Sequence, residues 1–378
     1  MRLRLLTVLI IPSLFLAFAL SVVILLLHPA PLGAPWVRTI VRGQGRTSFL
    51  LGNGQGERWS NVTVFGKRSL ALTDRENNTI RIIDMVTGKT LREIVTNGVA
   101  VGIDSDDTQM LMIATLEDSS TQQAVEIWDT TSGERLIERP FEVSDMFAFE
   151  FANVDERSYV IFGSANNPDD DLVDTFQVMN PQLGEYSERV VVPYSDFTTV
   201  DLAAHGDSLL MAAAGMSVRN DTDQGMVWLW SLDADGQFQP RAEYPLGEDF
   251  EWADGMDISA DGHHLAYSAT YGTRCPERFA TLTVIDLESG ESSALPSIER
   301  PLRVTFSPDG SRLAVIFAPL CDGDGPSGVM VIDLATGSST ILPHDGFLRV
   351  TALRFSDDSQ QLYTAAPNGA VMVWRLDV

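Results

Sequence analysis

The sequence predicts an all-β fold, a seven-bladed β-propeller, over residues 36–378. One unit recurs along this region: two apolar strands joined by an Asp- or Gly-containing turn, then a third strand and a Gly turn. The third strands carry a marker residue every 42 to 55 positions, at Ile83, Trp128, Met179, Trp230, Ile285, Ile332 and Trp374. Self-similarity at such a period is typical of repeat architectures.

The turns repeat in register with these markers. A glycine follows each of the first six, at Gly88, Gly133, Gly184, Gly236, Gly290 and Gly337. The first turns of the units align at Gly66, Asp106, Asp155, Gly206, Asp261, Asp309 and Asp358. Each unit is therefore a small antiparallel sheet, which cannot cover both of its faces alone. Seven such sheets arranged radially cover one another and leave only short edges.

The last unit lacks a fourth strand, because the sequence stops at Val378, four residues after Trp374. An open sheet edge would promote aggregation. We therefore expect an N-terminal segment to complete this sheet. RTSFLL (46–51) is the preferred segment, and WVRTIV (36–41) is the alternative.

Residues 5–27 form an uncharged apolar segment. As a helix it would be about 34 Å long, enough to cross a bilayer core. Arg2 and Arg4 precede it and the next basic residue is Arg38, so the positive-inside rule places residues 1–4 in the cytoplasm. We expect a signal-anchor helix at 5–27, a linker at 28–35 and the propeller outside, periplasmic or extracellular. A cleaved signal peptide, which would give a secreted protein, is the alternative.

The charge excludes one class of partner. The net charge is −26, and only two of the 26 basic residues are lysines, Lys67 and Lys89. A chain this acidic, with no basic patch, repels phosphate backbones, so nucleic acid is rejected as a partner. The acidity itself indicates either general solubility or a surface for a cationic or basic partner.

Several segments resemble known propeller repeats. Strands similar to those of WD40 repeats are VEIWDTTSGE (125–134) and VMVWRLDV (371–378). Three segments resemble the S-P-D-G repeats of TolB-like propellers: FSPDGSRLAV (306–315), ISADGHHLAY (258–267) and FSDDSQQLYT (355–364). Residues 72–98 resemble the YVTN-type repeats of surface-layer proteins. The resemblance covers essentially all of residues 36–378 and implies the fold, whereas propellers host many functions. The Gly-His dipeptide of eukaryotic WD repeats is absent, which favours a bacterial extracytoplasmic protein.

Motifs for chemistry are missing. The sequence has no H-E-x-x-H, C-x-x-C, G-x-S-x-G or glycine-rich phosphate loop, so no catalytic residue, metal ligand or cofactor is assigned. Three Asp-rich stretches, 166–174, 219–225 and 321–325, offer oxygen ligands that Ca²⁺ accepts. None has the spacing of an EF-hand loop, so solvated loops are the simpler interpretation and Ca²⁺ stays an alternative.

One rim of the ring is predicted to bind a partner. The connection between second and third strands is long in four adjacent units, at about 164–174, 215–225, 270–280 and 318–328, and Trp252 falls in an inter-unit loop on the same face. Rigid scaffolds commonly use such loops for binding. The candidate residues are Asp169, Asp170, Asp171, Asp221, Asp223, Trp252, Arg274, Arg278, Asp322 and Asp324. The expected partner is a protein or a small polar or cationic ligand.

The two cysteines, Cys275 and Cys321, occupy the same loop slot in adjacent units. Neighbouring blades would bring these loops together, so we expect a disulfide, which an oxidising compartment permits.

Three functions fit these observations. The first is a non-enzymatic, membrane-tethered binding or assembly module. The second is a lactonase-like propeller enzyme using Glu251, Asp254, Arg274 and Arg278, and the third is a calcium-stabilised surface protein. A lactone activity screen and a melt with and without chelator discriminate among them.

Overall fold

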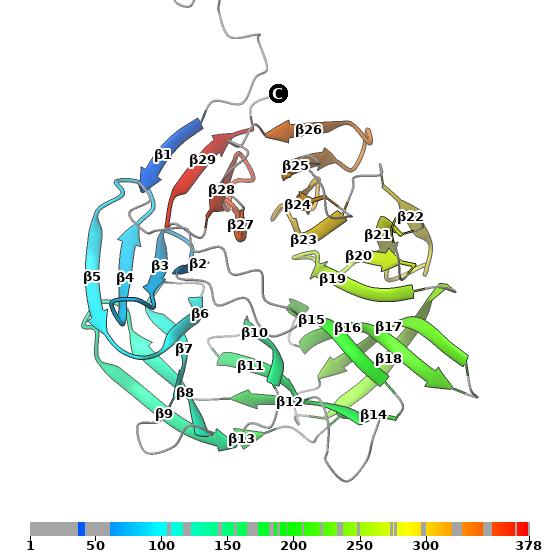
Figure 1. Ribbon diagram of the computed structural model, residues 1–378, viewed down its shortest axis with the longest axis horizontal. Helices are drawn as coiled ribbons and strands as arrows, with labels where there is room; N and C mark the ends of the chain where they lie inside the picture. Colours follow the sequence, from blue (N-terminus) through cyan, green and yellow to red (C-terminus); the bar gives the residue numbers. More distant parts are fainter. Residues whose placement is uncertain are drawn as a thin grey trace, which may run out of the picture.

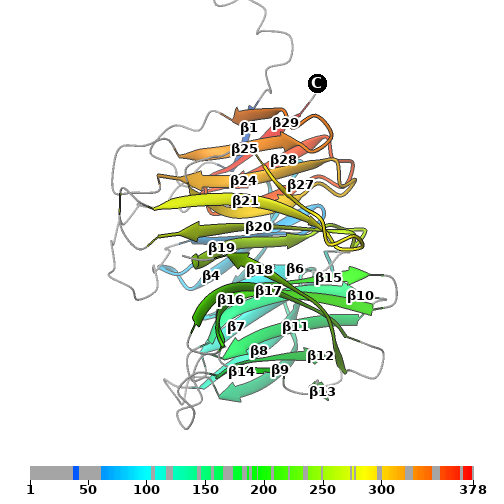
Figure 2. The same cartoon turned by 90° about the vertical axis from the view of Figure 1, so that its right-hand side faces the viewer.

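The structure is a computed structural model in which every described element is a β-strand, so the predicted all-β class is confirmed. The described residues are 37–41, 61–103, 107–115, 122–142, 146–154, 157–164, 173–180, 185–186, 190–193, 195–205, 208–219, 222–232, 237–247, 250–272, 275, 278–295, 300–319, 327–342, 350–366 and 369–376. Figure 1 shows the sheets arranged in a ring, and Figure 2 shows the same ring from the side.

Five sheets have four antiparallel strands each. The first sheet holds β2 (Asn61–Phe65), β3 (Ser69–Asp74), β4 (Thr79–Asp84) and β5 (Thr90–Val95), and the second holds β6 (Val99–Ile103), β7 (Gln109–Thr115), β8 (Gln122–Asp129) and β9 (Arg135–Glu142). Two further sheets hold β19 (Phe250–Ile258), β20 (His264–Tyr271), β21 (Phe279–Asp286) and β22 (Ser292–Ala294), and β23 (Arg300–Phe306), β24 (Arg312–Ala318), β25 (Gly328–Asp333) and β26 (Ser339–Leu342). The last sheet combines β1 (Val37–Val41) with β27 (Ala352–Phe355), β28 (Gln361–Ala365) and β29 (Val371–Arg375).

The remaining strands form one nine-stranded sheet. Its members are β10 (Met146–Val154), β11 (Arg157–Ser164), β12 (Val173–Asn180), β13 (Glu185–Tyr186), β14 (Val190–Pro193), β15 (Ser195–His205), β16 (Ser208–Arg219), β17 (Thr222–Leu232) and β18 (Phe238–Gly247). The β10–β14 part joins the β15–β18 part through one parallel pair, Val173 with Ser195. All seven predicted marker residues lie in the third strand of their unit.

An N-terminal strand completes the last sheet, as expected, but the preferred segment was wrong. Strand β1 pairs antiparallel with β29, with Val37 opposite Trp374 and Thr39 opposite Met372. The strand at the edge of β29 thus lies in the alternative segment, at Val37–Val41, whereas 46–51 lies outside the described residues. Both segments have strand-forming residues, so composition alone could not decide between them; the structure shows which one occupies the edge of β29.

The core lies between neighbouring sheets. Leu70 and Ile83 of one sheet pack with Val371 and Val373 of the next, and all four are almost fully buried. Ala266 and Leu282 pack in the same way against Val304, at the interface between the β19–β22 sheet and the β23–β26 sheet. Burial of apolar area at these interfaces, at roughly 25 cal/mol per Å², is what fixes the sheets to one another.

Aspartates hold the turns on one side of the ring. Asp84, Asp129, Asp286 and Asp333 end third strands, and each accepts the backbone N–H of the residue three positions later, at 2.6 to 2.8 Å. The hydrogen bond from that residue is the largest cause that lowers the pKa of each carboxyl. The predicted glycines then take a positive φ, at Gly88, Gly133, Gly290 and Gly337. Only glycine adopts that conformation without strain.

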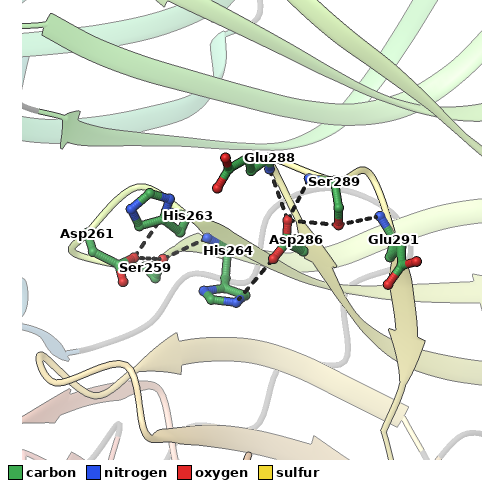
Figure 3. A network of polar contacts seen from close by, with 8 residues as sticks. All are labelled: Ser259, Asp261, His263, His264, Asp286, Glu288, Ser289 and Glu291. Carbon is green, nitrogen blue, oxygen red and sulfur yellow. Dashed lines mark hydrogen bonds and ion pairs between the residues drawn. The ribbon is translucent and has the colours of Figure 1, made fainter.

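The first turns use a second aspartate. In Figure 3, Asp261 accepts hydrogen bonds from the Ser259 hydroxyl, at 2.6 Å, and from the His263 N–H, at 3.0 Å. Partial burial acts to raise the pKa of Asp309, in the equivalent turn, but hydrogen bonds from Ser307 and Ser311 outweigh it and lower the pKa to about 2. These two kinds of turn lie on one side of the ring, which we call the turn face. The opposite side carries the connections between second and third strands and between sheets, and we call it the loop face.

Residues 5–27 lie outside the described residues. Within the described ranges, no helix has the length and apolar character needed to cross a membrane.

Candidate binding site on the loop face

The structure describes some of the predicted binding residues and not others. Trp252, Arg278 and the backbone of Asp223 are described. Outside the described residues lie Asp169, Asp170, Asp171, Asp221, Arg274, Asp322 and Asp324. Trp252 and Arg278 lie together on the loop face, at the sheet formed by β19–β22.

The predicted long loop at 215–225 was wrong. Strands β16 and β17 stay paired out to Arg219 opposite Thr222, so Asp223 lies within a strand, opposite Val218. Small and β-branched residues near this hairpin are compatible with extended pairing, and polar composition had suggested a loop. The other three long connections are present between their strands, after Ser164, Tyr271 and Ala318.

Trp252 and Asp254 lie near the start of β19, the first strand of its sheet. The Trp252 indole N–H donates to Asp254 Oδ2 at 2.9 Å. The Thr270 hydroxyl donates to the same oxygen at 3.2 Å. Trp252 is paired with Thr270 in the strand register, so the β-sheet places all three groups together. These bonds fix the orientation of the indole ring.

Arg300 joins this group from the neighbouring sheet. It is the first residue of β23, and its guanidinium donates through Nη2 to Asp254 Oδ1 at 2.6 Å and through Nε to Oδ2 at 3.1 Å. The Asp254 side chain is only 12% exposed and that of Arg300 28%. A bidentate pair with this burial is geometrically specific and less screened by salt than a surface pair.

Two guanidinium groups lie over the Trp252 ring. Arg278 Cζ is 4.6 Å from the ring centroid and Arg300 Cζ is 5.1 Å from it. Arg278 also donates its Nε–H to the Gly272 carbonyl at 3.3 Å. Both distances are within the range of cation–π attraction. Trp252, Asp254, Thr270, Arg278 and Arg300 form what we call the Trp252 cluster.

A glycine permits the close approach that this cluster needs. A Cβ added to Gly255 would lie 2.8 Å from both the Arg303 Cα and the Leu302 carbonyl oxygen. The first strands of two neighbouring sheets, β19 and β23, are therefore nearly in backbone contact there. This contact sets Asp254 within reach of Arg300.

Sequence reasoning missed Arg300. It had named Trp252 for the binding face and Asp254 only for the enzyme alternative, with Glu251, whose side chain is not described. Arg300 follows an inter-unit loop and begins a first strand, as Phe250 does one unit earlier. This equivalence of Arg300 and Phe250 was the one feature of the sequence that could have pointed to Arg300 as a residue of the loop face.

Cys275 lies on the same connection as Arg278. It is disulfide-bonded, and no described cysteine is free. Cys321, the only other cysteine of the chain, lies outside the described residues. The Cys275–Cys321 pairing therefore stays a prediction.

The described part of the chain holds no group of three or more His, Cys, Asp or Glu that could bind a metal ion. The Asp-rich stretches considered for Ca²⁺ lie largely outside it. No cofactor site follows from the described residues.

The strands and their ring define a β-propeller, and solved structures show the same fold. The hydrazine synthase of Kuenenia stuttgartiensis is similar with a TM-score of 0.61 and 13% identity, over 87% of this chain and 100% of that one. The WD40 domain of Neurospora crassa Pan2 is similar with a TM-score of 0.56 and 13% identity, over 85% of this chain and 89% of that domain. At this identity the likeness concerns the fold alone. No protein-family model matches the chain, and no curated protein matches its sequence.

Proposed function

We propose that this chain is a membrane-tethered, non-enzymatic binding or assembly module built on a seven-bladed propeller. Two blades come from the nine-stranded sheet, β10–β14 and β15–β18, and the five four-stranded sheets supply the rest. The single parallel pair between the two parts supports their treatment as separate blades. Each part also contains its own marker residue, Met179 or Trp230.

The tether is residues 5–27, as one helix with residues 1–4 in the cytoplasm and the propeller outside. The uncharged length and the position of Arg2 and Arg4 support this topology. The disulfide at Cys275 is consistent with an oxidising compartment. Protease added to intact spheroplasts should digest the propeller, and full protection would contradict the topology.

The Trp252 cluster carries the proposal of a binding role. Tryptophan and arginine are the side chains most enriched at the centre of protein interfaces, because they bury large area and form directed polar contacts. Here an indole and two arginines are held in place on the face that bears the long connections. We therefore favour a protein partner over a small cation. A cationic ligand would have to compete with Arg278 and Arg300 for the indole ring.

The enzyme alternative fits the cluster less well. Both Asp254 oxygens accept hydrogen bonds, from Arg300, Trp252 and Thr270. A carboxylate held in this way is suited to positioning its neighbours and less to accepting a proton from a substrate. Lactone hydrolysis by the full chain, lost in Asp254→Asn, would favour the enzyme.

Affinity capture tests the binding role. The tagged full chain is extracted from membranes with its partners, and co-purifying proteins are quantified for wild type, Trp252→Ala and Val86→Ala. Val86 is 65% exposed in a turn-face turn, so it is a control for loss of an exposed apolar group. We expect Trp252→Ala to lose partners that Val86→Ala retains, with both variants melting as folded proteins. An unchanged partner set in Trp252→Ala would contradict the proposal.

A further inference from the structure

The direction of β1 shows from which side the chain enters the ring. Val37 lies opposite Trp374, and Val41 lies opposite Val371. Strand β29 begins after the connection from β28, on the loop face, and ends near the first turn of its sheet, where the Leu376 N–H donates to the Gln360 carbonyl at 2.9 Å. Strand β1 runs the opposite way. The polypeptide therefore enters the ring on the turn face, at Val37.

Little chain separates this entry point from the apolar segment. Nine residues, 28–36, lie between Leu27 and Val37. Fully extended, nine residues reach about 30 Å. The longest strand, β16, has 12 residues and spans about 40 Å at 3.3 Å per residue. A linker of nine residues keeps the entry point on the turn face within about 30 Å of the bilayer.

Both lysines of the chain lie on the same side. Lys67 and Lys89 are in turns of the sheet next to β1 and β29, and both are exposed. Lys67 forms an ion pair with Asp357 of the β27–β29 sheet at 3.3 Å, which places it close to the entry point. The two amines therefore mark the turn face for chemical labelling.

We propose that the turn face is turned toward the membrane and that the Trp252 cluster is presented away from it. The partner of the loop face is then a macromolecule in the aqueous phase and not the lipid surface. This inference rests on the proposed tether at residues 5–27, and it adds the orientation, which the tether alone does not specify.

Energy transfer to the membrane surface tests the orientation. The full chain is reconstituted in vesicles of phosphatidylcholine and phosphatidylglycerol, which carry no amines, with a trace of acceptor-labelled lipid. A membrane-impermeant amine reagent then attaches the donor to the exposed lysines of outward-facing rings. The comparison variant is Lys67→Arg/Lys89→Arg/Gln224→Lys. Its only propeller lysine is on the loop-face side, because Gln224 is exposed near the start of β17.

We expect a greater loss of donor emission for wild type than for the variant. Equal losses, or a greater loss for the variant, would overturn the orientation. Extraction at alkaline pH is measured on the same vesicles, and a chain released from them would overturn the tether and the orientation with it. Retention of the chain together with reversed energy transfer would overturn the orientation alone. Matching thermal melts of the two proteins confirm that the variant is folded.

Discussion

The sheets at β19–β26 and the nine-stranded sheet solve the same folding problem differently. In the first region, the pairing ends at Ile258 opposite Leu265, with six residues between them, and Asp261 holds the intervening turn. In the second, pairing continues to His205 opposite Ser208, with only two residues between them. Strand β16 accordingly has 12 residues, whereas β24 has seven. Turn chemistry therefore contributes to the strand length, because an Asp-held turn stops the ladder. The other end of β16 is lengthened as well, since its pairing with β17 continues to Arg219 opposite Thr222.

The largest effect should come from removing the third-strand tryptophans. Trp374 is 1% exposed and donates its indole N–H to Thr364 Oγ1 at 3.0 Å, and Trp230 is 6% exposed in the nine-stranded sheet. Each change to alanine should destabilise by about 3–5 kcal/mol. Trp374→Ala should lower the melting temperature more, since it also loosens the closing strand β1. A larger drop in Trp230→Ala would show that closure adds little.

Gly255→Ala should come next. The added methyl would overlap backbone atoms of Leu302 and Arg303, and overpacking of this kind costs about 1–3 kcal/mol. The matched control is Gly328→Ala, where the nearest atom to the new Cβ is 3.5 Å away on a Phe317 ring. Thermal melting compares the two. Because Gly255 adjoins Asp254, partner capture should fall in Gly255→Ala and not in the control.

A smaller effect is expected when an Asp-held turn loses its carboxylate. Asp309 accepts the Ser307 hydroxyl at 2.6 Å and the Ser311 N–H at 3.0 Å. Asp309→Ala should cost about 1 kcal/mol, as for loss of a capping side chain. Asp357→Ala removes only exposed ion pairs, with Lys67 and Arg354, and should cost less. If Asp309→Ala and Asp357→Ala have the same melting temperature, the turns do not depend on aspartates such as Asp309.

The same turn chemistry decided which parts of the structure could be predicted from the sequence. The glycines after Asp84, Asp129, Asp286 and Asp333 were predicted, because a fixed spacing of Asp and Gly is a local signal. The hairpin at Arg219 and Thr222 was missed, since polar residues there resemble a loop. The choice of the closing strand and the contact of Arg300 with Asp254 were missed as well. Both join residues far apart in the sequence, and no local pattern encodes them.

A further predicted effect is a dependence of stability on acid pH. The pKa of Asp309 is about 2 in the folded chain, below about 3.9 for an unfolded aspartate. A lowered folded pKa gives stability that is present above the unfolded value and is lost as pH falls toward the folded one. Asp84, Asp286 and Asp333 are shifted in the same direction. The melting temperature should therefore fall between about pH 4 and pH 2, with a shallower slope in Asp309→Asn. An equal slope would contradict the assignment.

The central claim is that the Trp252 cluster on the loop face is where the partner binds. Site-specific photo-crosslinking in living cells tests it most directly. A photoreactive amino acid replaces Phe279, which is 51% exposed beside Arg278 at the start of β21 on the loop face, in one strain and Ala335, which is exposed on the turn face, in another. We predict that illumination produces a crosslinked protein adduct from position 279 and none from position 335. Adducts from position 335 with none from position 279 would contradict the account.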